Sequence, residues 1–281
     1  MILYLLVLLR IVSNPLSNLF QKRLTARAAD PVFLMAVTYG ALAVLSLPLL
    51  WWNAPTVDVS FWLNAAILAV VDVLGNVLLV LALERSEMSI FGPLNAWKAV
   101  VSLAFAAVLI HEIPSVRSLG GVALIVTGSI LLTRTEATAA TGPRHGVPIR
   151  LLSLLVLSLA AVFLKKLIMG SSPLYAFAWW AIGSAPVAIA VSFVRRRPHQ
   201  KRIMREYPGD YFWLILTFGI AQICVGFTFR ALPVGVALAL FQISTLLTIF
   251  FGHRYFEERG IRRRMLAAAI MMTGAVLAAW Q

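Results

Sequence analysis

Three charged residues lie inside apolar stretches of the sequence: Arg10, Asp72 and Lys98. A charge at the centre of a membrane-spanning helix costs about 2.5–3.5 kcal/mol on insertion scales, so such residues need a partner, a polar cavity or a function. The planar guanidinium of arginine suits two-point binding of a carboxylate or phosphate. These three residues therefore predict a polar site inside a hydrophobic helical protein.

Each of the three residues has polar neighbours at helical spacing. Arg10, Asn14, Ser17 and Asn18 form one polar stripe that is expected to point inward. Asp72 and Asn76 are four residues apart and share a helix face. Counted from the start of its predicted span at 90, Lys98 lies about 12 Å deep at 1.5 Å per residue.

Two interpretations of these charges remain open. In the functional one, Lys98 and Arg10 bind an anionic group of a substrate, and Asp72 binds a cation or relays a proton. In the structural one, Asp72 neutralises Lys98 or pairs with Arg10, and the ion pair holds helices together. Lesser candidates could wall the site or supply oriented hydrogen bonds, namely Tyr39, Trp97, Gln222, Gln242, Ser244 and Thr245.

The composition places the chain among membrane proteins. It is 61% hydrophobic and 12% charged, whereas about 25% of the residues of a soluble domain are charged. The net charge of +13 is interpreted as loop charge that orients the helices, so nucleic acid is not expected as a partner. The single Cys224 excludes a disulfide within the chain, and neither a metal site nor a cofactor is expected.

Ten segments are apolar enough to cross a membrane as helices. The first is expected to be retained rather than cleaved as a signal peptide, because no basic residues precede it. The predicted spans are 2–21, 32–52, 61–83, 90–110, 116–133, 150–168, 174–194, 210–231, 234–252 and 264–280.

The sequence repeats itself. The tract Phe20–Leu24 returns as Phe163–Leu167, and Asp30-Pro31 returns as Ser172-Pro173. Five spans in the first copy would turn the second copy upside down in the membrane. The predicted fold is therefore an all-α integral membrane protein of ten transmembrane helices, arranged as two inverted five-helix repeats around a central cavity. The expected boundaries are 1–136 for the first repeat, 137–149 for the loop between them and 150–281 for the second repeat.

The two repeats differ at the charged positions. Ser153, Phe218 and Ser244 occupy the places that match Arg10, Asp72 and Lys98. The hypothesis is that the first half holds the charged group of a substrate and that the second half shapes the cavity. Spans five and ten carry small residues and few polar ones, which predicts scaffold or dimer-contact helices.

Loop charge predicts the orientation of the chain. The loops on the side opposite the termini carry most of the Lys and Arg residues, Arg150 among them. The positive-inside rule places these loops in the cytoplasm, so both termini are expected outside.

The region after span four reads His111-Glu112-Ile113-Pro114-Ser115, followed by Leu119-Gly120-Gly121 and Val126-Thr127-Gly128, and the second half echoes it with Phe256-Glu257-Glu258 and Thr273-Gly274. This pattern resembles the drug/metabolite transporter superfamily, specifically its ten-helix EamA-type members. The resemblance implies a central site between the halves and export of amino acids or other small metabolites, or exchange of phosphate- or nucleotide-bearing sugars. It also implies cytoplasmic termini, which the loop charge contradicts.

The function predicted is a secondary active transporter in the cell (inner) membrane that exports a small polar metabolite, such as an amino acid, by alternating access. The alternative is an antiporter of a phosphorylated or other anionic solute, or a lipid-headgroup flippase. Energy would come from protons or from exchange, because no phosphate-binding loop for ATP is present. An enzyme is not expected, because His111 and Glu112 lie at one surface and His253, Glu257 and Glu258 at the other. The expected partners are a small-molecule substrate and the lipid bilayer, with the protein as a monomer or homodimer.

Overall fold

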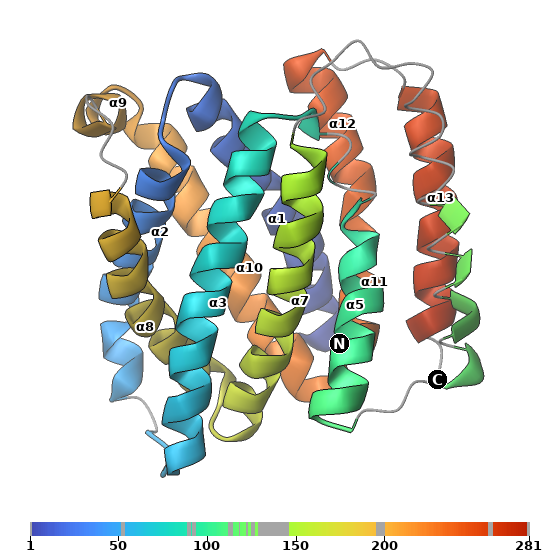
Figure 1. The fold of residues 1–281 in the computed structure, drawn as a ribbon, viewed down its shortest axis with the longest axis horizontal. Coiled ribbons are helices and arrows are strands. Elements are labelled where there is room, and N and C mark those ends of the chain that lie inside the picture. Colours follow the sequence, from blue (N-terminus) through green and yellow to red (C-terminus); the bar gives the residue numbers. More distant parts are fainter. Residues whose placement is uncertain are drawn as a thin grey trace.

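The computed structural model describes residues 2–51, 54–88, 91, 94–111, 115–117, 119–121, 123–124, 127–128, 146–194, 200–257 and 261–279. In these residues every regular element is a helix (Figure 1). The elements are α1 (Ile2–Ala26), α2 (Pro31–Ser46), the short 3-10 helix η1 (Leu47–Leu50), α3 (Val59–Glu84), α5 (Ala96–Leu109), α7 (Val147–Met169), α8 (Pro173–Val194), α9 (Gln200–Glu206), α10 (Pro208–Ala231), α11 (Val234–Phe241), α12 (Ser244–Phe256) and α13 (Ile261–Ala279).

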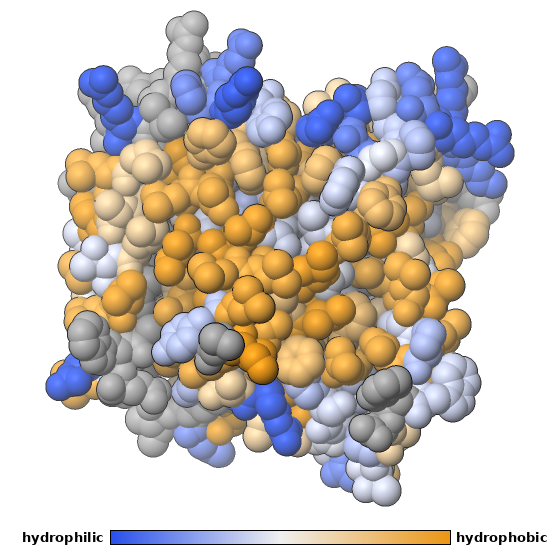
Figure 2. All heavy atoms as spheres, turned by 180° about the vertical axis from the view of Figure 1, so that it is seen from behind, coloured by the Kyte–Doolittle hydropathy of each residue, from blue (hydrophilic) through white to orange (hydrophobic). Residues whose placement is uncertain are grey.

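Among the described residues, seven stretches of helix are long and apolar enough to cross a membrane. They are 2–26, 31–50, 59–84, 147–169, 173–193, 208–231 and 234–256, each of which matches a predicted span. In the predicted spans 90–110 and 264–280, the apolar helical stretches found among the described residues are shorter, Trp97–Leu109 and Met265–Gly274. The predicted span 116–133 falls mostly outside the described residues. Apolar side chains form a broad belt between more hydrophilic edges, as an integral membrane protein requires (Figure 2).

The helices pack in matched pairs. α3 lies along α7, α1 lies along α10, and α2 lies against α8. In Figure 1, α1 starts at the lower side of the molecule and α7 at the upper side, so the two helices run in opposite directions. The described ends of the chain both lie at the lower side (Figure 1).

The start of helices α2 and α8 follows from the sequence. Asp30 caps α2, because its carboxylate accepts hydrogen bonds from the backbone N–H groups of Val32 and Phe33. Ser172 has the same place before α8, and its hydroxyl accepts from the backbone N–H of Tyr175 at 3.3 Å. Both repeated tracts thus begin a helix with a capping side chain followed by proline.

Lys22 and Lys165, which match in the sequence repeat, tie equivalent helix ends. Lys22 donates to the backbone carbonyl of Ser86, just after α3. Lys165 donates to the carbonyl of Leu232, just after α10, at 2.9 Å. The ammonium groups therefore satisfy carbonyls that the helix ends leave open.

The predicted span 234–252 is long enough to cross the membrane as one segment, but its helix is interrupted. α11 ends at Phe241 and α12 begins at Ser244. In the tight turn between them, the N–H of Thr245 donates to the carbonyl of Gln242 at 2.8 Å. The start of α5 has the same short-range bond, from the N–H of Lys98 to the carbonyl of Asn95 at 2.9 Å. Neither turn contains proline, so the hydrophobic pattern gave no sign of the interruption.

Small residues let the span-five region approach α13. A Cβ atom at Gly128 would lie 2.5 Å from Cγ of Met271 and 3.1 Å from the carbonyl oxygen of Ala267. The small residues predicted to mediate packing in spans five and ten thus form a contact within one chain. This favours the scaffold interpretation of these spans over the dimer-contact one.

Gly146→Ala is expected to destabilise the protein, because a Cβ atom there would collide with Ser86 and come within 2.5 Å of the carbonyl oxygen of Ala82. Overpacking of this kind typically costs about 1–3 kcal/mol. The matched control is Gly40→Ala, since nothing lies within 4 Å of a Cβ atom at Gly40. Thermal unfolding in detergent should show a lower midpoint for Gly146→Ala alone. Equal midpoints for the two variants would contradict this packing.

Candidate functional site

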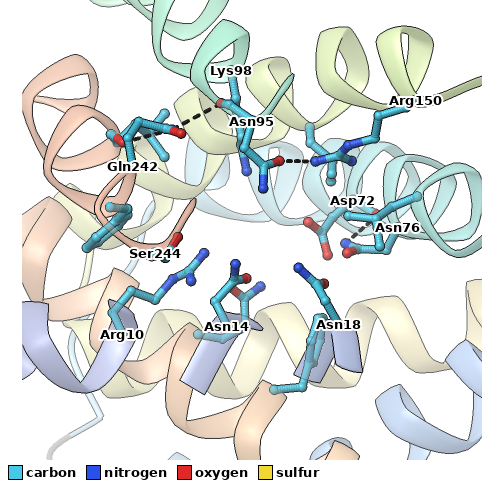
Figure 3. A pocket seen from close by; sticks show the side chains of 16 residues that line it. Arg10, Asn14, Asn18, Asp72, Asn76, Asn95, Lys98, Arg150, Gln242 and Ser244 are labelled. Atoms are coloured by element: carbon cyan, nitrogen blue, oxygen red, sulfur yellow. Dashed lines mark hydrogen bonds between the residues drawn. The ribbon is translucent and has the colours of Figure 1, made fainter. Parts of the chain in front are cut away.

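A polar cavity lies inside the helix bundle, beside the midpoints of α1 and α3 (Figure 3). Its volume is about 80 Å³, enough for several water molecules. Helices from both halves of the chain supply its walls. The lining residues are Arg10, Asn14, Asn18, Asp72, Asn76, Leu79, Asn95, Lys98, Arg150, Leu157, Phe218, Gln222, Leu238, Phe241, Gln242 and Ser244.

Most of the residues singled out in the sequence meet in this cavity. They are Arg10, Asn14, Asn18, Asp72, Asn76, Lys98, Gln222, Gln242 and Ser244. Four others are not among the described lining residues, namely Ser17, Tyr39, Trp97 and Thr245. Tyr39 is fully buried behind Asp72, and Trp97 packs against a small cluster formed by Leu94 and Leu154. Helical periodicity therefore located the inward faces correctly, but not the environment of these two aromatic residues.

The polar stripe of α1 forms one wall. Arg10, Asn14 and Asn18 face the cavity at four-residue steps (Figure 3). Ser17 instead donates to the backbone carbonyl of Asn14 at 2.8 Å, within its own helix. The guanidinium of Arg10 lies 5.0 Å from the centre of the Phe241 ring, so an aromatic face supports the buried cation.

Asp72 is held in a network of neutral donors. One oxygen of its carboxylate, Oδ2, accepts from the hydroxyl of Tyr39 at 2.6 Å and from the indole N–H of Trp180 at 2.8 Å. The side-chain amide of Asn76 donates to the same Tyr39 hydroxyl at 3.0 Å. The carboxylate is 6% exposed, so the network fixes its position at the cavity wall. The role of Trp180 could not be read from the sequence, because it looks like any aromatic residue of an apolar helix.

An aromatic cluster separates the cavity from a second, apolar groove. The ring of Tyr39 lies 5.3 Å from that of Trp180 and 6.0 Å from that of Phe218, and Phe177 lies 5.5 Å from Trp180. Phe218 faces the cavity, whereas Phe177 faces the groove between α2 and α10. The groove is lined by Val37, Gly40, Ala41, Leu42, Val44, Leu45, Leu49, Phe177, Met204, Phe212, Ile215, Leu216, Gly219, Ile220 and Ile223.

The prediction that Arg150 belongs to a surface loop is wrong. The side chain is 2% exposed and lines the cavity. It donates to the side-chain oxygen of Asn95 and, at 3.0 Å, to the hydroxyl of Ser153. The reason is that α7 begins at Val147, before the predicted start of the span at 150. Arg150 therefore lies in the first turn of the helix and points inward.

A contact between Asn95 and Gln242 was not predicted from the sequence. The side-chain amide of Gln242 donates to the backbone carbonyl of Asn95 at 3.0 Å, which joins the interruption in α11–α12 to the start of α5 (Figure 3). Asn95 was not singled out in the sequence. A signal was available, since Asn95 precedes Lys98 by three residues and shares its helix face.

The predicted structural ion pairs do not form in this conformation. Within the described part of the chain, the ion pairs join Asp210 to Arg23 at 3.6 Å and to Arg27, near the ends of α10 and α1. Neither Arg10 nor Lys98 lies within ion-pair distance of Asp72 among these residues. The charges that line the cavity are therefore not explained as helix-joining pairs.

Several buried polar atoms of the cavity have no hydrogen-bond partner. They include Nε and Nη1 of Arg10, Nε of Arg150 and Oε1 of Gln242. Leaving such groups unsatisfied is costly, so they point to a polar occupant of the cavity.

The structure also bears on the expectations about metal and catalysis. Over the described residues, no group of three or more His, Cys, Asp or Glu side chains could hold a metal ion. His111 follows the end of α5, whereas His253 belongs to the last turn of α12. These two helix ends lie at opposite sides of the molecule, that of α5 at the lower side and that of α12 at the upper side (Figure 1). Glu112 and Glu258 lie outside the described residues.

Comparison with known proteins agrees with this architecture. Residues 1–134 match the model of the EamA-like transporter family. A solved crystal structure of a protein is similar over 98% of this chain and 95% of its own, with a TM-score of 0.68 and 14% sequence identity, which shows a shared fold. No curated protein matches the chain. The resemblance predicted from the sequence is confirmed over residues 1–134.

Proposed function

We propose, from the match of residues 1–134 to the EamA-like transporters of the drug/metabolite transporter superfamily, that the protein is a secondary active transporter that exports a small polar metabolite. The observation that carries this proposal is the polar cavity inside the bundle. Residues of both halves line it, among them Asn14 and Asp72 from the first and Gln222 and Gln242 from the second. Catalysis is not part of the proposal.

Alternating access would follow from two inverted five-helix repeats, and the packing supports that arrangement. The pairing of α3 with α7 has its counterpart in the pairing of α10 with α1, and α1 and α7 run in opposite directions (Figure 1). The matched contacts of Lys22 and Lys165 at helix ends point the same way. A site between inverted units can be exposed to either side of the membrane by rocking one unit against the other.

The substrate class proposed first is a polar metabolite such as an amino acid. The cavity offers amide donors and acceptors from Asn14, Asn18, Asn76 and Gln222, which suit polar groups rather than a wholly apolar molecule. Asp72 is the residue proposed to carry a proton if transport is coupled to the proton gradient, because it is the single carboxylate among the described residues that line the cavity.

A second candidate is an antiporter of a phosphorylated or otherwise anionic solute, which Arg150 favours because it adds a cation to the cavity. A lipid headgroup would need a sideways path from the bilayer. Toward the α2/α10 groove that path is filled by the rings of Tyr39, Trp180 and Phe218. A soluble solute therefore fits this conformation better than a flippase substrate.

The experiment that tests alternating access uses the single native cysteine. Cys224→Ser gives a protein without thiols in one change, and Asn14→Cys then places a thiol in the cavity wall. In inverted and right-side-out vesicles, an impermeant thiol reagent should label this cysteine from either face, and a bound substrate should shift the ratio between the faces. Labelling from one face alone, unchanged by every solute tried, would rule out the proposal.

A thermal-shift screen would identify the substrate without a transport assay. Ligands that bind the folded state raise its unfolding temperature by mass action. Amino acids, phosphorylated sugars and headgroup analogues form the panel, and Asn14→Cys labelled with a bulky reagent is the control with a blocked cavity. A solute that stabilises the unlabelled protein alone is bound in the cavity.

Both termini are proposed to lie outside the cell membrane, although removal of Arg150 from the loops weakens the charge bias by one residue. A reporter that is active only in the cytoplasm, fused after Gln281, is expected to be inactive, and an externally active reporter at the same place should be active. The reverse pattern would assign cytoplasmic termini, as the family resemblance implies.

A further inference from the structure

The cavity has an excess of positive charge. Arg10 on α1, Lys98 on α5 and Arg150 on α7 line it, and Asp72 on α3 is the one acidic residue among the lining side chains that the structure describes. Arg10 reaches in from one wall, and Lys98 and Arg150 lie on the opposite one (Figure 3). Three separate helices thus direct cations at the same small space.

Asp72 does not neutralise these cations by direct contact. Its oxygen Oδ2 accepts hydrogen bonds from Tyr39 and Trp180, which are neutral donors. Among the described residues, none of the three cations lies within ion-pair distance of a carboxylate. Each would cost about 2.5–3.5 kcal/mol in the membrane interior if it stayed uncompensated.

Donor groups of the two arginines remain available. Nε and Nη1 of Arg10 and Nε of Arg150 are buried without a hydrogen-bond partner. Arg150 has a structural role, because its guanidinium donates hydrogen bonds to the side chains of Asn95 and Ser153. That role does not account for Arg10, whose guanidinium lies against the ring of Phe241, 5.0 Å from its centre. Helix packing alone therefore leaves the positive charge of the cavity unexplained.

We propose that Arg10, Lys98 and Arg150 together bind a carboxylate or phosphate, and that the transported solute is a small organic anion. This inference rests on the proposed transport function and narrows its substrate. Guanidinium groups bind both anions through charge-assisted, often two-point hydrogen bonds. Amides of Asn14, Asn18 and Gln222 remain for the neutral polar part of the solute. The second half thus also contributes charge, contrary to the hypothesis that the first half alone holds the charged group.

The test measures binding to the purified full-length protein with matched solutes. The probes are glycerol 3-phosphate and succinate as anions, glycerol as the neutral partner of the phosphate, and alanine as a zwitterion. We expect both anions, or one of them, to raise the unfolding temperature, with no response to glycerol. Arg10→Gln and Arg150→Gln should each weaken anion binding by about tenfold or more, because each removes a charge-assisted contact.

Two further variants keep the result interpretable. Arg150→Lys retains the positive charge if Arg150→Gln fails to fold, and it should bind anions more tightly than Arg150→Gln does. Arg254→Gln is the matched control, because Arg254 is exposed near the end of α12 and should leave binding unchanged. Equal binding in the wild-type protein, Arg10→Gln and Arg150→Gln would overturn the proposal.

The outcomes separate the substrate class from the transport function. If alanine binds and both anions do not, the anion inference fails while the transporter proposal stands. If no probe binds and the Asn14→Cys thiol is labelled from neither face, the transporter proposal itself fails. Nanodiscs with phosphatidylglycerol, compared with soluble glycerol 3-phosphate, distinguish a lipid headgroup from a free solute. Arginine-dependent binding of either supports the anion site.

Discussion

Asp72→Asn is expected to abolish accumulation of the solute against its gradient in proteoliposomes with an imposed pH difference. Solute exchange in the same vesicles should persist. Asn lacks the titratable group that would carry a proton, but its side-chain oxygen can still accept from Tyr39 and Trp180, which donate to a single carboxylate oxygen in the native protein. A difference of one pH unit supplies about 1.4 kcal/mol per proton, which supports about a tenfold ratio of solute concentration across the vesicle membrane. In Asp72→Asn this concentration ratio should fall to one.

The contrast with Asp72→Ala separates coupling from folding. Alanine leaves the hydroxyl of Tyr39 and the indole N–H of Trp180 buried without their acceptor, at about 1–3 kcal/mol for each group. Asp72→Ala should therefore unfold at a lower temperature than Asp72→Asn, which should stay close to the native protein. Full pH-driven accumulation in Asp72→Asn would show that another group carries the proton or that transport is pure exchange.

The sequence was most informative where one residue sets one local feature. The mid-span positions of Arg10, Asp72 and Lys98 predicted an internal polar cavity, because a charge in an apolar helix must face away from lipid. The four-residue spacing of Arg10, Asn14 and Asn18 fixed which side of α1 faces it. Seven spans were predicted correctly for the same reason, since length and hydropathy are properties of each segment alone.

The parts that were missed depend on contacts between segments. Arg150 adjoins a polar stretch of the sequence and was therefore interpreted as a loop residue. Its inward position follows only from the structure, in which α7 starts at Val147 and Arg150 donates hydrogen bonds to Asn95 and Ser153. Trp180 acquires its role only because α8 lies close enough to reach Asp72 on α3. Neither relation has a signature in periodicity, which reports on one helix at a time.

Lys98→Met is expected to lower solute affinity by about tenfold or more with little loss of stability, because it removes one charged contact to the solute. Methionine keeps the length of the aliphatic chain, and no ion pair joins Lys98 to a carboxylate among the described residues. Binding to purified protein gives the affinity, and thermal unfolding without solute gives the stability. A large drop in unfolding temperature with unchanged affinity would instead assign Lys98 a structural role.

The double variant Asp72→Asn/Lys98→Met decides between the two interpretations of the cavity charges. If the two residues serve mainly to neutralise each other, removing both charges should restore the solute affinity and the accumulation that either single change loses. If Lys98 binds the solute and Asp72 carries a proton, the losses concern different steps, and the double variant should lack both affinity and pH-driven accumulation. The structure favours the second outcome, because Asp72 is already held by Tyr39 and Trp180 and does not need Lys98 to fix its position. Recovery of binding in the double variant would show that the charges form a structural pair in another conformation of the transport cycle.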